Sequence, residues 1–204
     1  MMLQGLKLKY KMLLLLFCCP LMMMGQRRQR DIPVEVQIKV LDKTGNRNLI
    51  LYGKDRPLKI EDFKARPDAA SPGVAATYSG IAMEIEGKTE NGVLVTIVQL
   101  TVYFDAAQSW MKKEGKTERV LQHEQNHFDL TAIKACDLAQ AIAGSSYNYS
   151  NVRQRLRELH RVHTSELQKL QKNYDKETKH GTVAAQQTAW AARIAASLDK
   201  VTCF

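Results

Sequence analysis

Apolar and polar residues alternate with two different periods along this chain, one in its first half and the other in its second half. Over residues 33–41, Val and Ile occupy every second position, which is the period of a β-strand with one buried face. The same period returns over residues 81–85, and Asn91-Gly92 separates it from another apolar run, residues 93–104. Because Asn-Gly is a preferred two-residue turn between antiparallel strands, these two runs predict a hairpin.

After the hairpin, the apolar positions recur every three or four residues, which is the period of amphipathic helices. Thr117 is a candidate N-cap for a long helix that ends near Gly144. Two further helices are expected over residues 151–174 and 183–201, with Gly181 between them. The second half of the chain therefore predicts three helices.

A short helix is also expected directly after the hairpin, capped by Asp105 and running through Trp110 and Met111. Strands that precede helices are typical of an α+β domain, here an N-terminal antiparallel sheet packed on three C-terminal helices. The chain has 204 residues, 45% of them hydrophobic, which is enough for a sizeable core. We expect one domain over residues 26–204.

The first long helix contains His123-Glu124-x-x-His127. Residues four apart share one face of a helix, so the two imidazoles can bind a single Zn²⁺. Glu124 flanks that face, where its carboxylate can act as general base on a water in the open position of the metal. Leu121 and Leu130 indicate a buried helix, which argues against an exposed helix with two solvated histidines. The motif predicts a zinc site on a zincin-like fold.

Catalytic zinc usually has three protein ligands, so a third ligand is expected downstream of the motif. If the second long helix runs antiparallel to the first, His163 and Glu166 come level with His127. His163 also lies on the apolar stripe of its helix, where a core histidine is the alternative interpretation. His180 precedes Gly181 in a turn, where its ring can swing inward. The candidates are Glu158, His160, His163, Glu166, Asp175 and His180.

Two stretches, residues 123–129 and 174–181, followed by Gln187 and Trp190, carry a resemblance to a known family. The chain resembles a bacterial family described as predicted secreted zinc-dependent proteases, otherwise a domain of unknown function. The resemblance covers most of the chain after residue 25 and implies peptidase chemistry without defining a substrate. It favours His180 as the third ligand, with Asp175 supporting the ligands or replacing His180.

The expected function is that of a zinc metallopeptidase acting on a peptide or protein substrate, with Zn²⁺ held by His123, His127 and His180. Glu124 would take a proton from water and pass it to the leaving amine. Tyr174 is a candidate donor to the developing oxyanion, or else a packed aromatic residue. Two alternatives stay open: a non-catalytic envelope binding module on a peptidase-like fold, and a zinc hydrolase of a non-peptide substrate. The intact Glu124 argues against a pure binding module, which does not need that carboxylate.

Residues 1–25 have the pattern of a secretory signal peptide. Three Lys precede an apolar run, residues 12–24, which has about the length of a signal-peptide core and is too short for a comfortable membrane span. A lipid anchor through Cys18 or Cys19 is the alternative, although Phe17 fits a lipobox poorly. We therefore expect an exported protein, periplasmic or secreted, without a transmembrane span in its mature form.

The formal net charge of the full chain is +9. Without residues 1–25, the chain retains 27 basic and 21 acidic residues, a net charge of +6 spread over the helices. The only dense basic run, residues 26–30, lies at the new N-terminus and is interpreted as a solvated tail. We expect no nucleic-acid partner.

Cys136 and Cys203 are the two cysteines outside the leader. Export would place them in an oxidising compartment, where an even pair tends to form a disulfide. The alternative is a pair of buried free thiols. The pattern favours a Cys136–Cys203 disulfide.

Overall fold

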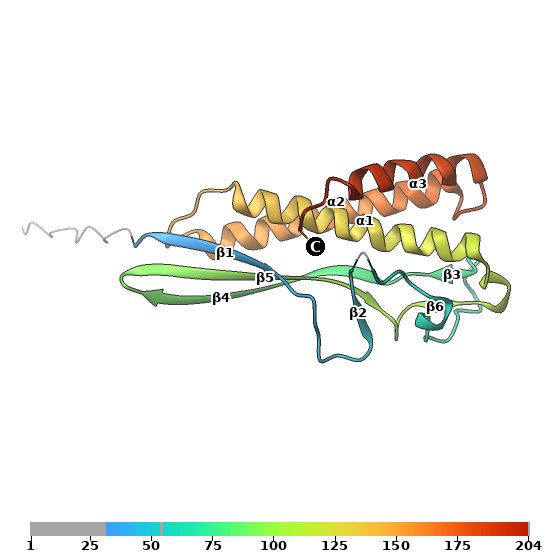
Figure 1. Ribbon diagram of the computed structural model, residues 1–204, viewed down its shortest axis with the longest axis horizontal. Helices are drawn as coiled ribbons and strands as arrows, with labels where there is room; N and C mark the ends of the chain where they lie inside the picture. The colour runs from blue at the N-terminus through green and yellow to red at the C-terminus, as the bar shows by residue number, and fades with distance from the viewer. Residues whose placement is uncertain (1–31, 54, 204) are drawn as a thin grey trace, which may run out of the picture. The chain divides into compact units, whose positions relative to one another are not determined.

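Three helices cover one face of a mixed β-sheet in the computed structural model (Figure 1). The structure describes residues 32–53 and 55–203, so the predicted leader, with Cys18 and Cys19, lies outside the described residues. The strands precede the helices along the chain, which confirms the α+β class predicted from the sequence.

The main sheet is built around its longest strand, β5, which pairs with β4 on one side and with β1 and then β2 on the other. Asn91 and Gly92 join β4 to β5 with backbone φ angles of 50° and 79°, as a tight hairpin turn requires. The predicted hairpin is therefore confirmed. The four strands are β1 (Val34–Val40), β2 (Leu49–Leu51), β4 (Ser79–Glu90) and β5 (Val93–Asp105).

The prediction of an antiparallel sheet is wrong for one strand, because β1 runs parallel to β5. Val34 lies opposite Leu94 and Val40 opposite Leu100, and the chain then leaves the sheet and returns as the antiparallel strand β2. The alternation of Val and Ile identifies a strand and its buried face, but it carries no information about strand direction. The sheet is mixed for this reason.

The expected short helix after Asp105 is also absent. Asp105 Oδ1 accepts a hydrogen bond from the Ala107 backbone N–H at 2.9 Å, which closes a turn instead of capping a helix. The next residues form strand β6 (Trp110–Met111), which pairs antiparallel with β3 (Ala75–Ala76). This two-stranded sheet lies near the start of the motif helix (Figure 1).

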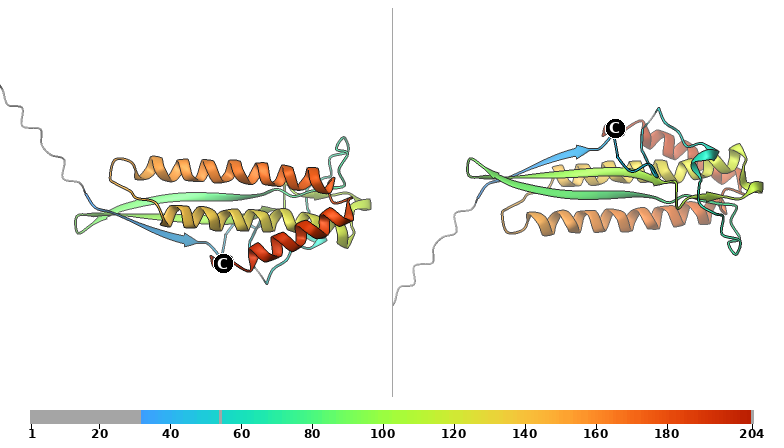
Figure 2. Two further views of the ribbon diagram at one scale, coloured as in Figure 1. Left: turned by 90° about the horizontal axis from the view of Figure 1, so that it is seen from above. Right: turned by 90° about the horizontal axis from the view of Figure 1, so that it is seen from below.

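The three predicted helices are present as α1 (Glu118–Ala143), α2 (Val152–Thr178) and α3 (Ala184–Leu198). Thr117 caps α1, since its side chain accepts a hydrogen bond from the Val120 backbone N–H. Single turns of 3₁₀-helix occupy Ile60–Asp62 and Lys113–Gly115. Figure 2 shows α1 along the middle of the helical layer, with α2 along one edge.

The core lies between α1 and the inner face of the sheet. Phe128 of α1 is fully buried and packs against the rings of Phe104 and Tyr52, with centroid separations of 6.0 Å and 5.1 Å. The polar residues on the opposite face of α1 are largely buried as well, because α2 and α3 pack against that face. Polar side chains on that face must find partners on the other helices.

Cys136 of α1 and Cys203 form a disulfide, with their sulfur atoms 2.08 Å apart and their Cα atoms 5.8 Å apart. The predicted Cys136–Cys203 pairing is confirmed, and it links the segment after α3 covalently to α1. None of the described helices is both long and apolar enough to span a membrane.

Candidate metal centre

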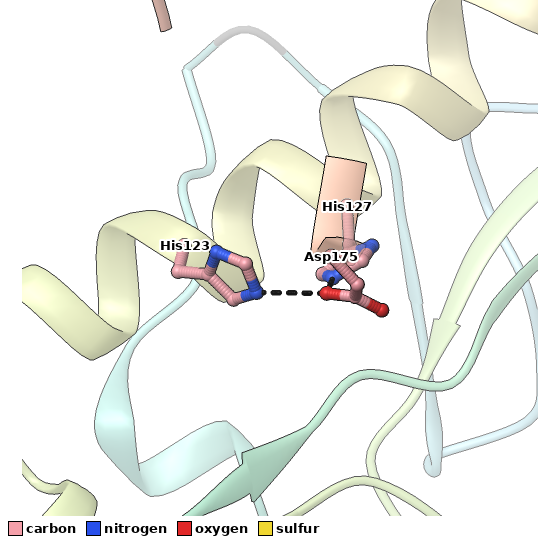
Figure 3. A group of neighbouring side chains, drawn as sticks. All are labelled: His123, His127 and Asp175. Atoms are coloured by element: carbon pink, nitrogen blue, oxygen red, sulfur yellow. Dashed lines mark hydrogen bonds and ion pairs between the residues drawn. The ribbon is translucent and has the colours of Figure 1, made fainter. Parts of the chain in front are cut away.

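His123 and His127 project from neighbouring turns of α1 towards one carboxylate on α2 (Figure 3). Asp175 Oδ1 lies 3.1 Å from His123 Nε2 and 3.0 Å from His127 Nε2. Both histidines are buried, while the Asp175 side chain is 29% exposed and faces the open side of the group. The structure thus brings together two imidazole nitrogens and one carboxylate oxygen from two helices.

These three side chains have the composition and spacing of a zinc site. One potential ligand atom from each lies within 4.8 Å of the other two. Ligands at 2.0–2.1 Å from a tetrahedral Zn²⁺ are roughly 3.3 Å apart, close to the two nitrogen–oxygen distances in this group. Two histidines with one carboxylate form a common catalytic zinc set that leaves a fourth position open. The residues present therefore fit the metal.

A contact at Nδ1 of His123 determines that Nε2 is the ring nitrogen available to a metal. Nδ1 lies 3.1 Å from Oε1 of Gln187, and the Gln187 Nε2 group donates to the Tyr174 hydroxyl at 2.7 Å. With the amide in this orientation, Nδ1 carries the hydrogen and donates it to Gln187. The lone pair is then on Nε2, the nitrogen that faces Asp175. Metal-binding histidines usually have such a partner on their other nitrogen.

Tyr174 lies beneath the histidines and is fully buried. Its ring stacks on His123 with centroids 4.6 Å apart, and its hydroxyl accepts from Asn126 Nδ2 at 3.1 Å as well as from Gln187. Burial comes first among the causes that raise the pKa of Tyr174, to about 12. Tyr174 does not line the cleft at the metal centre, so the structure supports the packed aromatic and not the oxyanion donor.

Asp175 and the two histidines shift one another's pKa values so that the carboxylate is negatively charged and protonation of His123 is favoured. Burial raises the pKa of Asp175, but hydrogen bonds and positive charge from His123 and His127 outweigh it and hold that pKa well below its usual range. Burial lowers the pKa of His123, while Asp175, Glu124 and Gln187 raise it, and the net shift is upward. The ligand group therefore stabilises a cation between the nitrogens and the carboxylate, whether a proton or a metal ion.

His180 is placed at the rim of this group and not inside it. Its side chain is 75% exposed, and its Nδ1 lies 3.5 Å from Asp175 Oδ1. The metal-binding set found among the described residues contains His123, His127 and Asp175, without His180. The geometry therefore favours Asp175 as the candidate third ligand, whereas the sequence favoured His180.

The remaining candidates for the third ligand serve other contacts on α2. His160 Nε2 lies 2.8 Å from the backbone oxygen of Ile81, and Glu166 pairs with Lys134 at 2.9 Å. Glu158 forms an ion pair with Arg161 on the surface of α2. His163 lies on the inner side of the helix, and burial followed by the Lys134 charge lowers its pKa. None of these four side chains belongs to the metal-binding set.

A turn with three successive left-handed residues follows α2 and packs on the metal centre. Lys179, His180 and Gly181 have φ angles of 46°, 53° and 78°. A Cβ on Gly181 would meet the His123 ring at 3.1–3.2 Å, so the backbone of this turn lies directly against the ligand. Left-handed backbone at two non-glycine residues is unfavourable and is concentrated at functional sites in proteins.

The metal centre opens into a cleft of about 570 Å³. Glu124 lines this cleft beside the two histidines, and the segment 71–77 forms part of its wall. The two residues of β3 in this segment are too few to produce an alternating pattern, so this wall of the cleft was not identified from the sequence. The contributions of Gln187 and Asn126 were also missed, although Asn126 is a polar residue inside a buried helical motif.

No protein-family model, curated protein or solved structure matches this chain. The function therefore has to be inferred from the geometry of the metal centre and the cleft.

Proposed function

We propose that this chain is an exported zinc-dependent peptidase of the zincin type, with Zn²⁺ held by His123, His127 and Asp175. The observation that carries the proposal is the convergence of these three ligand atoms from two helices, with Glu124 beside them in the same cleft. A structural zinc site usually has four protein ligands, whereas three ligands at an open cleft are typical of catalysis.

Bound Zn²⁺ supplies a lowered water pKa and polarisation of a substrate carbonyl. Glu124 follows His123 directly on α1 and is not needed as a ligand, so its carboxylate is available as the general base. It takes a proton from the attacking water and returns that proton to the leaving amine nitrogen. Gln187 and Tyr174 hold His123 in position while the proton moves.

The backbone of one wall of the cleft supports a peptide substrate. The Val74 backbone oxygen accepts a hydrogen bond from the Lys112 N–H at 2.7 Å, and Ala75 and Ala76 continue this pairing with β6. Because hydrogen-bonded pairs alternate along antiparallel strands, the backbone N–H and C=O of Ala75 point away from β6. Ala75 lines the cleft, so an extended peptide can pair with it as an added strand.

Two features of the chain support export. Residues 1–25 have a leader pattern, and the Cys136–Cys203 disulfide is typical of an oxidising compartment. The mass of the mature protein tests this part, since a protein that starts at Met1 in the cytoplasmic fraction would contradict it.

The decisive experiment combines metal analysis with cleavage of a broad peptide library. The purified wild-type protein should contain one equivalent of zinc and cleave peptides. Glu124→Gln should keep the zinc and lose cleavage, whereas Glu118→Gln, an exposed change on the same helix, should leave both intact. A zinc-loaded wild type that cleaves no peptide would reject the peptidase function and leave a binding module or a hydrolase of another substrate.

A further inference from the structure

The exposed side of α2 carries two groups of basic residues, one in its first two turns and one in its last three turns. Six of these side chains are exposed and have no ion-pair partner within 4.0 Å among the described residues. They are spread over about 35 Å of helix at a rise of 1.5 Å per residue. These residues, which form the α2 basic face, are Arg153, Arg155, Arg157, Lys169, Lys172 and Lys176.

The acidic residues of α2 offset only part of this charge, because Glu158 and Glu166 interact electrostatically with Arg155 and Lys169 as well as with their ion-pair partners. Glu158 pairs with Arg161 of the same helix, and Glu166 pairs with Lys134 of α1. Glu177 contacts Arg193 of α3, and Asp175 is directed into the metal centre. Every carboxylate of α2 is thus already engaged with a cation or a histidine. The α2 basic face therefore keeps an excess of positive charge that is available to an external partner.

The position of this face suits a broad planar partner. Helix α2 lies along one edge of the helical layer, so no other helix covers its outward side (Figure 2). Tyr149, just before the helix, is one of two large apolar side chains that are markedly exposed among the described residues. Tyrosine is favoured at the boundary between water and lipid, because its ring is apolar and its hydroxyl is polar.

We propose that the α2 basic face binds the surface of a bilayer that contains anionic phospholipids. A row of Lys and Arg with one exposed aromatic residue matches anionic headgroups at a water–lipid boundary. A nucleic acid is less well matched, because single-strand binding uses several stacking aromatics along the basic groove and this face offers one tyrosine beside it. The disulfide also indicates an oxidising compartment, where membranes and not nucleic acids are the abundant anionic surface.

This docking is independent of zinc and of peptidase activity. The metal centre lies near the C-terminal end of α2, and Lys179 at the rim of the cleft follows directly after the basic face. A protein held on a membrane through α2 therefore keeps its cleft next to the lipid surface. The bound form would encounter membrane-attached partners at high local concentration.

Co-sedimentation with lipid vesicles tests the proposal. The purified protein should bind vesicles of phosphatidylcholine mixed with phosphatidylglycerol, and not vesicles of phosphatidylcholine alone. Binding should weaken as salt is raised, since exposed charges are screened. Replacing Arg153, Arg157, Lys169 and Lys172 with Gln should reduce the partition coefficient by more than about 100-fold, given roughly a five-fold contribution per cation.

A charge-matched control separates this face from the net charge of the protein. Four exposed cations on the sheet side, Lys39, Lys43, Arg47 and Lys88, are changed to Gln together, which gives the same net charge. This control should bind anionic vesicles almost as well as wild type. Both variants should retain the wild-type circular dichroism spectrum and zinc content, which shows that they are folded.

Three results would overturn the proposal. Equal binding to the two kinds of vesicle would exclude headgroup charge as the determinant. An equal loss in both variants would attribute the binding to net charge. Tighter binding to a duplex or single-stranded DNA fragment than to anionic vesicles, lost only in the α2 variant, would assign the face to a nucleic acid.

Discussion

Gln187 Oε1 lies 3.1 Å from His123 Nδ1, on the opposite side of the ring from Asp175. This contact joins α3 to the metal centre, although Gln187 cannot reach the metal position itself. Its effect is on the tautomer of His123, because the nitrogen that donates to Gln187 cannot bind a metal.

Gln187→Leu should lower zinc affinity by about 10- to 100-fold without unfolding the protein, since it removes the group that fixes the His123 tautomer. Competition with a fluorescent zinc chelator measures the change. Gln186→Leu, an exposed substitution on the same helix, should leave zinc affinity unchanged. Gln187→Glu retains an acceptor for the Nδ1 hydrogen and should bind zinc more tightly than Gln187→Leu. Equal affinity of Gln187→Leu and wild type would reject the positioning role.

Asp175→Ala should abolish tight zinc binding, whereas His180→Ala should retain it. Removing Asp175 leaves two histidines and opens the coordination shell to water, while His180 lies at the rim with its side chain largely exposed. Zinc content after dialysis, measured by mass spectrometry, gives the answer. Glu177→Ala is the matched control on α2 and should keep its zinc. An empty His180→Ala variant together with a loaded Asp175→Ala variant would restore His180 as the ligand.

Zinc affinity should fall as the pH is lowered, and the decline should begin above the ordinary histidine pKa of about 6.5. The raised pKa of His123 means that the metal-free site holds a proton that zinc must displace. In the metal-free protein, this proton contributes stability below about pH 6.5, and the contribution is lost as the pH rises through the raised pKa.

Calorimetry in buffers with different ionisation heats should therefore detect protons released on zinc binding near neutral pH. The number released per zinc should decrease as the pH increases. Zinc binding without proton release close to pH 7 would contradict the raised pKa of His123.

Replacing both Cys136 and Cys203 with Ser should lower the free energy of unfolding by roughly 4 kcal/mol in the chain-entropy description of loop closure. The disulfide closes a loop with a sequence separation of 67 residues, and this loop contains the whole of α2 and α3. Urea unfolding measures the loss, and wild-type protein treated with reductant should show a similar decrease. A midpoint unchanged by either treatment would mean that the disulfide does not stabilise the fold.

The sequence by itself determined the features that depend on local periodicity. The four-residue spacing places His123 and His127 on one face of α1, and Thr117 marks where that helix begins. Asn91-Gly92 defines the hairpin, because few other residue pairs adopt positive φ at both positions. Each of these features is set by residues within a few positions of one another.

Only the tertiary structure decided which residue completes the candidate metal centre. Asp175 is 48 residues beyond His127, and it meets both histidines because of how α2 packs against α1. Asp175 and His180 are five residues apart, yet one lies within the last turns of α2 and the other in the turn after it. Which of the two reaches the histidines depends on where α2 ends and how it packs, and no local pattern specifies that end to the residue.

The direction of β1 was decided in the same way. Its alternating residues fit a parallel or an antiparallel neighbour equally well, and only the folded chain places β1 parallel to β5 and β2 antiparallel to it. The period of the apolar positions shows whether a segment is a helix or a strand and which of its faces is buried. The partner across an interface depends on packing between distant segments, which is why the third ligand and the mixed sheet emerged only from the folded chain.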